Sequence, residues 1–140
     1  KSQESKIISS AMVASWVSQA SFSPPGITIS VAKDRAVEAL LHIGDEFTLN
    51  ILAENQKKAL MKPFLQSFAP GANRLEGMEL TRSPANQPIL TKALAWLEGK
   101  VEQRMECGDH WLIYARINHG EVLDLDGITA VHHRKTGSTY

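Results

Sequence analysis

The chain has 140 residues, 43% hydrophobic and 21% charged, which is typical of a single soluble domain with an apolar core. Its 15 basic and 15 acidic side chains cancel, so no net charge attracts nucleic acid or an anionic membrane surface. No apolar run reaches the roughly 20 residues of a membrane helix, and the opening "KSQESKIISS" is too polar for a signal peptide. We therefore expect one domain, residues 1–140, that binds neither nucleic acid nor membrane.

The stretch "ASWVSQASFSPPG", residues 14–26, predicts the first strand. With the two-residue period of a strand, we expect one side to face the core: Trp16, Ser18, Ala20 and Phe22. The other side is small and hydrogen-bonding, without the charges of an ordinary solvent face: Ser15, Val17, Gln19 and Ser21. This second side raises the question of which ligand it contacts.

Further strands and two short helices are expected along the next part of the chain. After "SPPG" breaks the chain, "ITISVAK" alternates as a half-buried strand with three inward residues: Ile27, Ile29 and Val31. "DRAVEALLHIGD" predicts a helix capped by Asp34 and ended by Gly44, with one apolar face: Val37, Leu40 and Leu41. "EFTLNIL" predicts a strand with three aligned residues: Phe47, Leu49 and Ile51. "NQKKALMKPFLQSF" predicts helical pieces, restarted at Pro63, with a core stripe: Leu60, Met61, Phe64, Leu65 and Phe68.

The second half of the chain predicts a long loop and then antiparallel hairpins. Residues 69–88 are rich in Gly, Asn and Pro, and we expect an exposed connection there. Three extended segments follow, "LAWLEGKVEQRME", "WLIYARI" and "GEVLD", separated by "CGDH" and "NHG". The pattern as a whole predicts a mainly β domain, a barrel or sandwich of antiparallel strands with short helices.

The chemistry of the first strand favours a flavin. A flat aromatic ligand edged with hydrogen-bond acceptors and a donor suits a strand of small residues, whose backbone amides and hydroxyls are accessible. Lys33 and Arg35 lie at the start of the first predicted helix, where unpaired amides also favour a phosphate. Asp34 opposes this in part, because its carboxylate would cap the same helix end.

Three segments together resemble the flavin reductase-like domain, in the form found at the C-terminal end of flavodiiron proteins of oxygenic phototrophs. They are "ASWVSQASFSPPGITISVAKDRAVEALL", "EFTLNILAE" and "CGDHWLIYARINHGEVLD", and the resemblance runs from about Ser10 to Tyr140. It implies a split β-barrel that binds FMN and pairs as a homodimer, with the flavin close to the interface. The location it implies is the cytoplasm or the chloroplast stroma, and a reducing compartment fits the single Cys107.

The resemblance also implies roles for individual residues. It places Ser15, Trp16, Val17 and Ser18 against the flavin ring and ribityl chain, with Gln19 and Ser21 following on the same strand. It makes Lys33 and Arg35 the phosphate ligands, and it puts His110, with Asp109 beside it, near the flavin ring and the nicotinamide of NADH or NADPH. No residue is expected to act as a nucleophile, because the implied chemistry is hydride transfer between two stacked rings.

The sequence departs from the family in two respects. Relatives begin earlier, so we expect the first N-terminal strand of the family to be missing, which would leave a sheet edge exposed. A flavodiiron protein also needs a diiron domain and a flavodoxin-like domain, and neither is present in these residues. The chain would then pass electrons toward an oxygen-reducing centre on other domains, which are its expected partners.

Other interpretations remain open for the same residues. Trp16 is equally compatible with core packing, Lys33 and Arg35 with solvated charges, and His110 with a structural turn. Cys107 and His110 have the spacing of half a zinc site, but no second half exists, so no metal is expected. The chain is either an NAD(P)H:flavin oxidoreductase module or a non-catalytic module that accepts electrons from a protein such as ferredoxin. A structural dimerisation domain is a third possibility.

Overall fold

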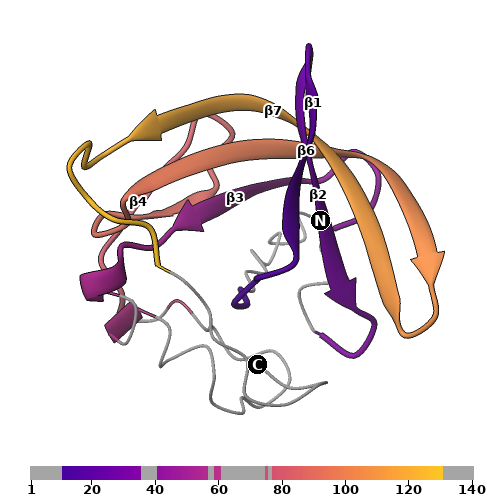
Figure 1. Cartoon of the computed structure of the whole chain (residues 1–140), viewed down its shortest axis with the longest axis horizontal. Coiled ribbons are helices and arrows are strands. Elements are labelled where there is room, and N and C mark those ends of the chain that lie inside the picture. The colour runs from indigo at the N-terminus through magenta and orange to yellow at the C-terminus, as the bar shows by residue number, and fades with distance from the viewer. Residues whose placement is uncertain (1–10, 36–40, 57–58, 61–74, 76, 131–140) are drawn as a thin grey trace, which may run out of the picture.

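The computed structural model of the chain describes residues 11–35, 41–56, 59–60, 75 and 77–130 (Figure 1). Five antiparallel strands form the main sheet in the order β1-β2-β7-β6-β3, and two more, β4 and β5, form a small second sheet. The strand bounds are β1 Val17–Phe22, β2 Pro25–Ala32, β3 Glu46–Ile51, β4 Leu80–Arg82, β5 Pro88–Leu90, β6 Ala95–Cys107 and β7 His110–Val122. A short 3-10 helix, η2, spans Glu54–Gln56. No helix in the described part of the chain is long and apolar enough to cross a membrane.

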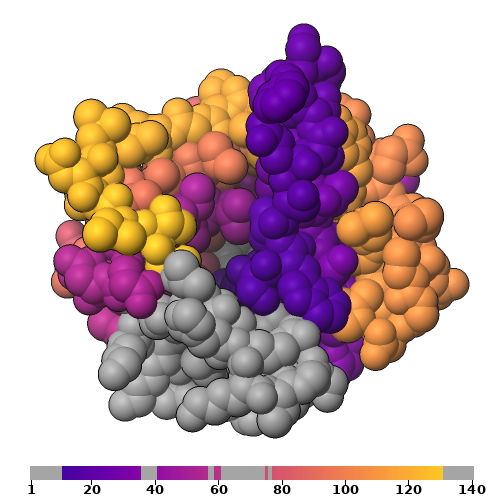
Figure 2. Space-filling view, viewed as in Figure 1, coloured from indigo at the N-terminus to yellow at the C-terminus, as the bar shows by residue number. Residues whose placement is uncertain are grey.

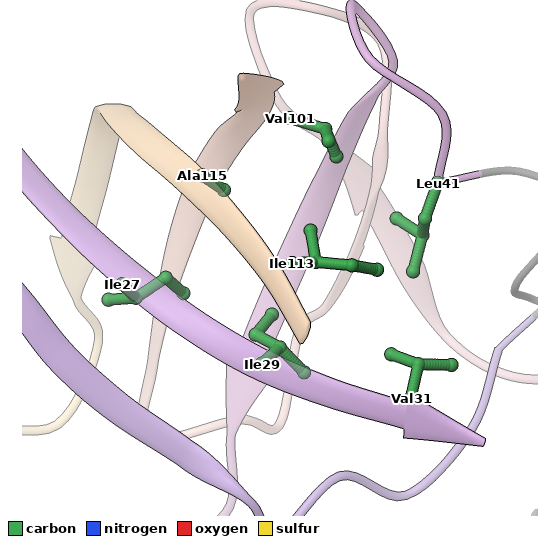
Figure 3. Packing of buried hydrophobic residues seen from close by; sticks show 7 residues of the cluster. All are labelled: Ile27, Ile29, Val31, Leu41, Val101, Ile113 and Ala115. Carbon is green, nitrogen blue, oxygen red and sulfur yellow. The ribbon is translucent and has the colours of Figure 1, made fainter. Parts of the chain in front are cut away.

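The core forms on one face of the main sheet, where β2, β7 and β6 lie side by side. The predicted inward residues of β2 are buried, and Val31 is only 1% exposed. They pack with residues of the neighbouring strands and with Leu41 (Figure 3), in a cluster made of Ile27, Ile29, Val31, Leu41, Val101, Ile113 and Ala115. The alternation of β2 therefore predicted its buried face correctly, because one side of this strand faces solvent-excluded apolar residues along its length.

The predicted faces of β1 are wrong. Val17 packs against the core, whereas Trp16 is 44% exposed and Phe22 is 86% exposed. The register explains this, since Val17 pairs with the buried Ile29 and cross-strand partners share a face of the sheet. An irregularity between Gln19 and Ser21 then shifts the register, so one two-residue period does not describe the whole strand.

The three extended segments predicted near the C-terminus are two long strands. β6 and β7 have 13 residues each, and the turn between them is the predicted "CGDH", with Gly108 at φ 60°. The predicted turn "NHG" lies inside β7, where Gly120 pairs with Leu97. A Cβ on Gly120 would lie 2.9 Å from Leu97 Cδ2, so this glycine permits close packing of two strands and does not form a turn.

The predicted exposed loop at 69–88 is replaced, over its described part, by the β4–β5 hairpin. Its turn is held by Glu98 of β6, which is 1% exposed, and by Ser83, which is 6% exposed. The Ser83 hydroxyl donates a hydrogen bond to Glu98 Oε2, and the Ala85 N–H donates to the same oxygen at 3.2 Å. The Gln87 N–H donates to Ser83 Oγ at 2.9 Å. These polar groups are buried because each has a partner.

Residues 36–40 of the first predicted helix and most of the second lie outside the described residues. The described residues 41–45 of the first are not helical, so the predicted end of that helix is wrong. Val37 and Leu40 are not described. Neither are residues 61–68, which contain Pro63 and most of the second apolar stripe. Leu41 and Leu60 are buried as expected. Gly44 has φ 94° and its N–H donates to the Val101 carbonyl at 2.8 Å, so it forms a turn that leads into β3.

Candidate functional site

Strand β1 lies at an edge of the main sheet, and among the described strands it pairs only with β2. Figure 1 shows the β1–β2 hairpin extending beyond the neighbouring strands. The Trp16 carbonyl accepts a hydrogen bond from the Ser30 N–H at 3.0 Å, so the alternation of a strand turns the N–H and C=O of Val17 away from β2. Ser18 and Gln19 are exposed on the same strand. Within the described part of the chain no strand pairs with the other side of β1, so a ligand with donors and acceptors along one edge can bind there.

The Trp16 indole lies against the His110 imidazole, with the ring centroids 4.9 Å apart and the planes inclined by 32°. The sheet brings them together. Trp16 bonds to Ser30 of β2, and His110 pairs with Ala32, the next residue on the same face of β2. The two rings form a partly exposed aromatic surface beside the free edge of β1. A flat ring can stack on such a surface.

Asp109 orients the His110 ring. Its carboxylate lies 2.7 Å from His110 Nδ1, although 95% of the Asp109 side chain is exposed. The hydrogen bond from His110 and its nearby charge hold the pKa of Asp109 below its usual value. The contact directs Nδ1 toward the carboxylate and so sets which edge of the ring faces other groups.

The predicted phosphate ligands lie at the same end of the sheet but in different surroundings. Lys33 Nζ forms an ion pair with Glu106 Oε2 and lies 5.6 Å from the centroid of the Trp111 ring. The ion pair lowers the pKa of Glu106, first through the hydrogen bond from Lys33 and then through its charge. Arg35 is exposed, and its backbone N–H donates a hydrogen bond to the Ala32 carbonyl at 3.1 Å.

These residues are divided between the two faces of the sheet. Trp111 pairs with Val31 and packs against the core, so Lys33 reaches the core side, whereas Trp16 and His110 are on the opposite side. The Lys33 N–H donates to the Asp109 carbonyl at 2.9 Å, which joins the two groups at the end of the sheet. A ligand that touched both groups would pass over this end.

Sequence reasoning missed Glu106, Arg104 and Trp111. The Arg104 guanidinium lies 4.3 Å from the Trp111 ring centroid, and it donates to the Leu41 carbonyl at 3.0 Å. Another of its contacts is with His42 Nδ1 at 2.8 Å. Arg104 therefore ties the segment before β3 to β6. No local pattern could have revealed this, because the residues are more than 60 positions apart in the sequence.

A large cavity lies elsewhere in the molecule. A cavity of about 740 Å³ opens on the core side of the sheet, and Figure 2 shows a hollow between the N-terminal segment and the C-terminal part of the described chain. Of the predicted flavin-binding residues, only Ser15 and Val17 line it. Two of its polar lining residues already have partners, because Thr48 and Asn50 donate to the Pro88 carbonyl. We therefore place the candidate site at the β1 edge and not in this mainly apolar cavity.

No group of three or more metal-ligating side chains is found within the described part of the chain. Cys107 is exposed, and its thiol lies 3.7 Å from the Met105 carbonyl oxygen. His132 and His133 lie outside the described residues.

The sequence matches the family described as "Flavin reductase like domain" over residues 2–138. It is 54% identical over 133 residues to diflavin flavoprotein A 1 of Synechocystis sp., an alignment that covers 95% of this chain and 23% of the relative. The chain therefore spans about a quarter of the length of this relative.

Two solved structures show the same fold. The NADH:FAD oxidoreductase of Streptomyces globisporus matches with a TM-score of 0.76 and 24% identity, over 84% of this chain and 70% of that one. The flavin reductase component of a bacterial two-component tryptophan halogenase matches with a TM-score of 0.72 and 23% identity, over 86% and 82% of the two chains. The predicted mainly β fold of the split-barrel type is confirmed.

Proposed function

Since the chain belongs to the flavin reductase-like domain family, as its sequence led us to expect, we propose that it binds FMN and accepts electrons for it from NADH or NADPH. The family and the diflavin flavoprotein relatives support a flavin oxidoreductase module. FMN as the particular flavin, and the nicotinamide donor, are our proposals.

The free edge of β1 beside the Trp16–His110 pair is the observation on which this proposal rests. Flavin has a flat ring and a row of acceptors with one donor along its pyrimidine edge, which fits an aromatic surface next to accessible backbone groups. We assign Ser15, Val17, Ser18, Gln19 and Ser21 to this edge. The exposure of Ser18 and Gln19 is compatible with that assignment.

The remaining predicted residues divide into a ring group and a phosphate group. Trp16 and His110 cover one side of the ring, and Asp109 sets the orientation of His110. Lys33 and Arg35 hold the phosphate at the end of the sheet, because their positive charges attract the phosphate anion. A bound flavin supplies the electron acceptor, and the chain binds and orients the two reactants.

We further propose that the electrons pass to an oxygen-reducing diiron centre on other domains of a longer protein, next to a flavodoxin-like domain. The chain's match to about a quarter of a diflavin flavoprotein supports this arrangement. We propose a homodimer as well, in which the second copy lies close to the flavin bound at the exposed β1 edge.

A second candidate is a docking module that accepts electrons from a protein donor such as ferredoxin. The 86% exposed Phe22 at the end of the protruding β1–β2 hairpin favours it, since an exposed aromatic side chain is a common anchor for a partner protein.

Anaerobic absorbance spectroscopy of the purified chain, reconstituted with FMN, separates these functions. We expect a yellow protein that NADH or NADPH bleaches. Colour that persists with both nucleotides but is lost with reduced ferredoxin would support the docking module. A chain that binds no flavin would refute both and leave a structural dimerisation domain. Analytical ultracentrifugation of the same sample tests the homodimer.

A further inference from the structure

We propose that Glu106 determines how strongly the site prefers phosphorylated over unphosphorylated flavin, because its carboxylate competes with the phosphate for Lys33. The inference rests on the proposed flavin site and adds a residue to it. Three features support it: the ion pair between Lys33 and Glu106, the strand register that creates this pair, and the other charges at the same end of the sheet.

The register of the sheet brings these two residues together although 73 positions separate them. Trp111 of β7 pairs with Val31 on one side and with Glu106 on the other. Lys33 is two residues beyond Val31, so its side chain extends over the Trp111 ring and meets Glu106 across β7. The contact is thus built by three adjacent strands.

The ion pair between Lys33 and Glu106 is accessible enough for a phosphate to displace the carboxylate. The side chains of Lys33 and Glu106 are 36% and 63% exposed, and ion pairs exposed to this degree contribute little stability. The Glu106 carboxylate is charged at neutral pH even at the ordinary pKa of a glutamate, and Lys33 lowers that pKa further. A phosphate that approaches Lys33 therefore meets a negative charge already bound to that ammonium group.

Other charges at this end of the sheet increase the importance of Glu106. Asp109 is close enough for the charge of Lys33 to contribute to its lowered pKa. Asp34 lies between Lys33 and Arg35 in the sequence. The Arg104 guanidinium also lies over the Trp111 ring, so three cations face these three carboxylates. Removal of the Glu106 charge therefore makes the local potential more favourable for an anion.

The test measures dissociation constants for FMN and riboflavin by quenching of flavin fluorescence, with the whole chain and two variants. Glu106→Gln removes the charge and keeps the shape. Glu102→Gln is the matched control, because Glu102 is exposed on the same strand, four residues or about 13 Å along it. We expect Glu106→Gln to bind FMN roughly three- to tenfold more tightly, with riboflavin unchanged, and the gain to shrink in high salt. Glu102→Gln should match the unmodified chain for both flavins.

The outcomes separate this inference from the proposed function. If the unmodified chain binds FMN but Glu106→Gln leaves the ratio of FMN to riboflavin affinity unchanged, the inference is wrong and the flavin site stands. Weaker FMN binding by Glu106→Gln also overturns it, since Glu106 would then position Lys33 for the phosphate. If the unmodified chain binds neither flavin, the proposed function fails and the inference fails with it.

Discussion

Replacing Glu98 with alanine should destabilise the domain far more than replacing any exposed carboxylate of the same sheet. Glu98 is 1% exposed, and one of its oxygens accepts hydrogen bonds from the Ser83 hydroxyl and the Ala85 N–H. Each hydrogen bond to a charged group contributes about 1.5–3 kcal/mol, and relief of the carboxylate's burial returns part of the sum. We therefore expect a loss of about 2–4 kcal/mol in the free energy of unfolding.

Urea unfolding followed by tryptophan fluorescence measures this loss, provided that the denaturant dependence stays the same in the variant. Glu98→Gln should lose only about 1–2 kcal/mol, because an amide oxygen still accepts a hydrogen bond. The exposed Glu102→Ala is the control and should stay within about 0.5 kcal/mol of the unmodified chain.

A double-mutant cycle with Ser83→Ala tests the contact itself. If the hydroxyl bonds to the carboxylate, the two substitutions together should destabilise by less than the sum of their separate effects, by about 1–3 kcal/mol. A loss below about 0.5 kcal/mol for Glu98→Ala, or strictly additive effects, would refute the reasoning that Glu98 holds the β4–β5 turn.

Three further predictions concern the candidate site. Arg35→Ala should weaken FMN several-fold more than riboflavin in a fluorescence titration, because only FMN carries the phosphate; equal losses would remove Arg35 from the site. His110→Ala should slow anaerobic flavin reduction about tenfold or more while the protein stays yellow, and loss of colour would make His110 structural. The pKa values of Asp109 and Glu106 are lower in the folded chain, so their stabilising effect is complete above their unfolded values near about pH 4 and is lost as the pH falls further. The melting temperature of Asp109→Asn should therefore fall less in acid than that of the unmodified chain. An equal fall in both proteins would contradict this.

The alternation of apolar and polar residues predicted the buried face of a strand correctly where that face lies against the core along its whole length. β2 was predicted with its buried residues, since every second side chain from Ile27 to Val31 faces the core. It failed for β1, where the apolar Trp16 and Phe22 are exposed and the register with β2 turns Val17 inward. It also failed at Gly120, because a glycine required for close contact between strands looks like a turn in the sequence.

Some residues of the candidate site could be predicted from the sequence, and others only from the structure. The sequence suggested Trp16, Lys33, Asp109 and His110 as site residues, and the structure brings all four to one end of the sheet. The sequence alone gave no indication of Glu106, because an ion pair across three strands depends on register and not on neighbours in the chain.

The sequence by itself determined the mainly β character and the alternation of the buried strand, since these follow from local composition and period, and its resemblance to known relatives indicated the family. Only the tertiary structure decided which face of β1 is exposed, that Glu98 is buried beneath a turn, and that Lys33 is already paired. The physical reason is that burial and charge pairing depend on contacts between residues distant in the sequence, and the pairing of strands determines these contacts.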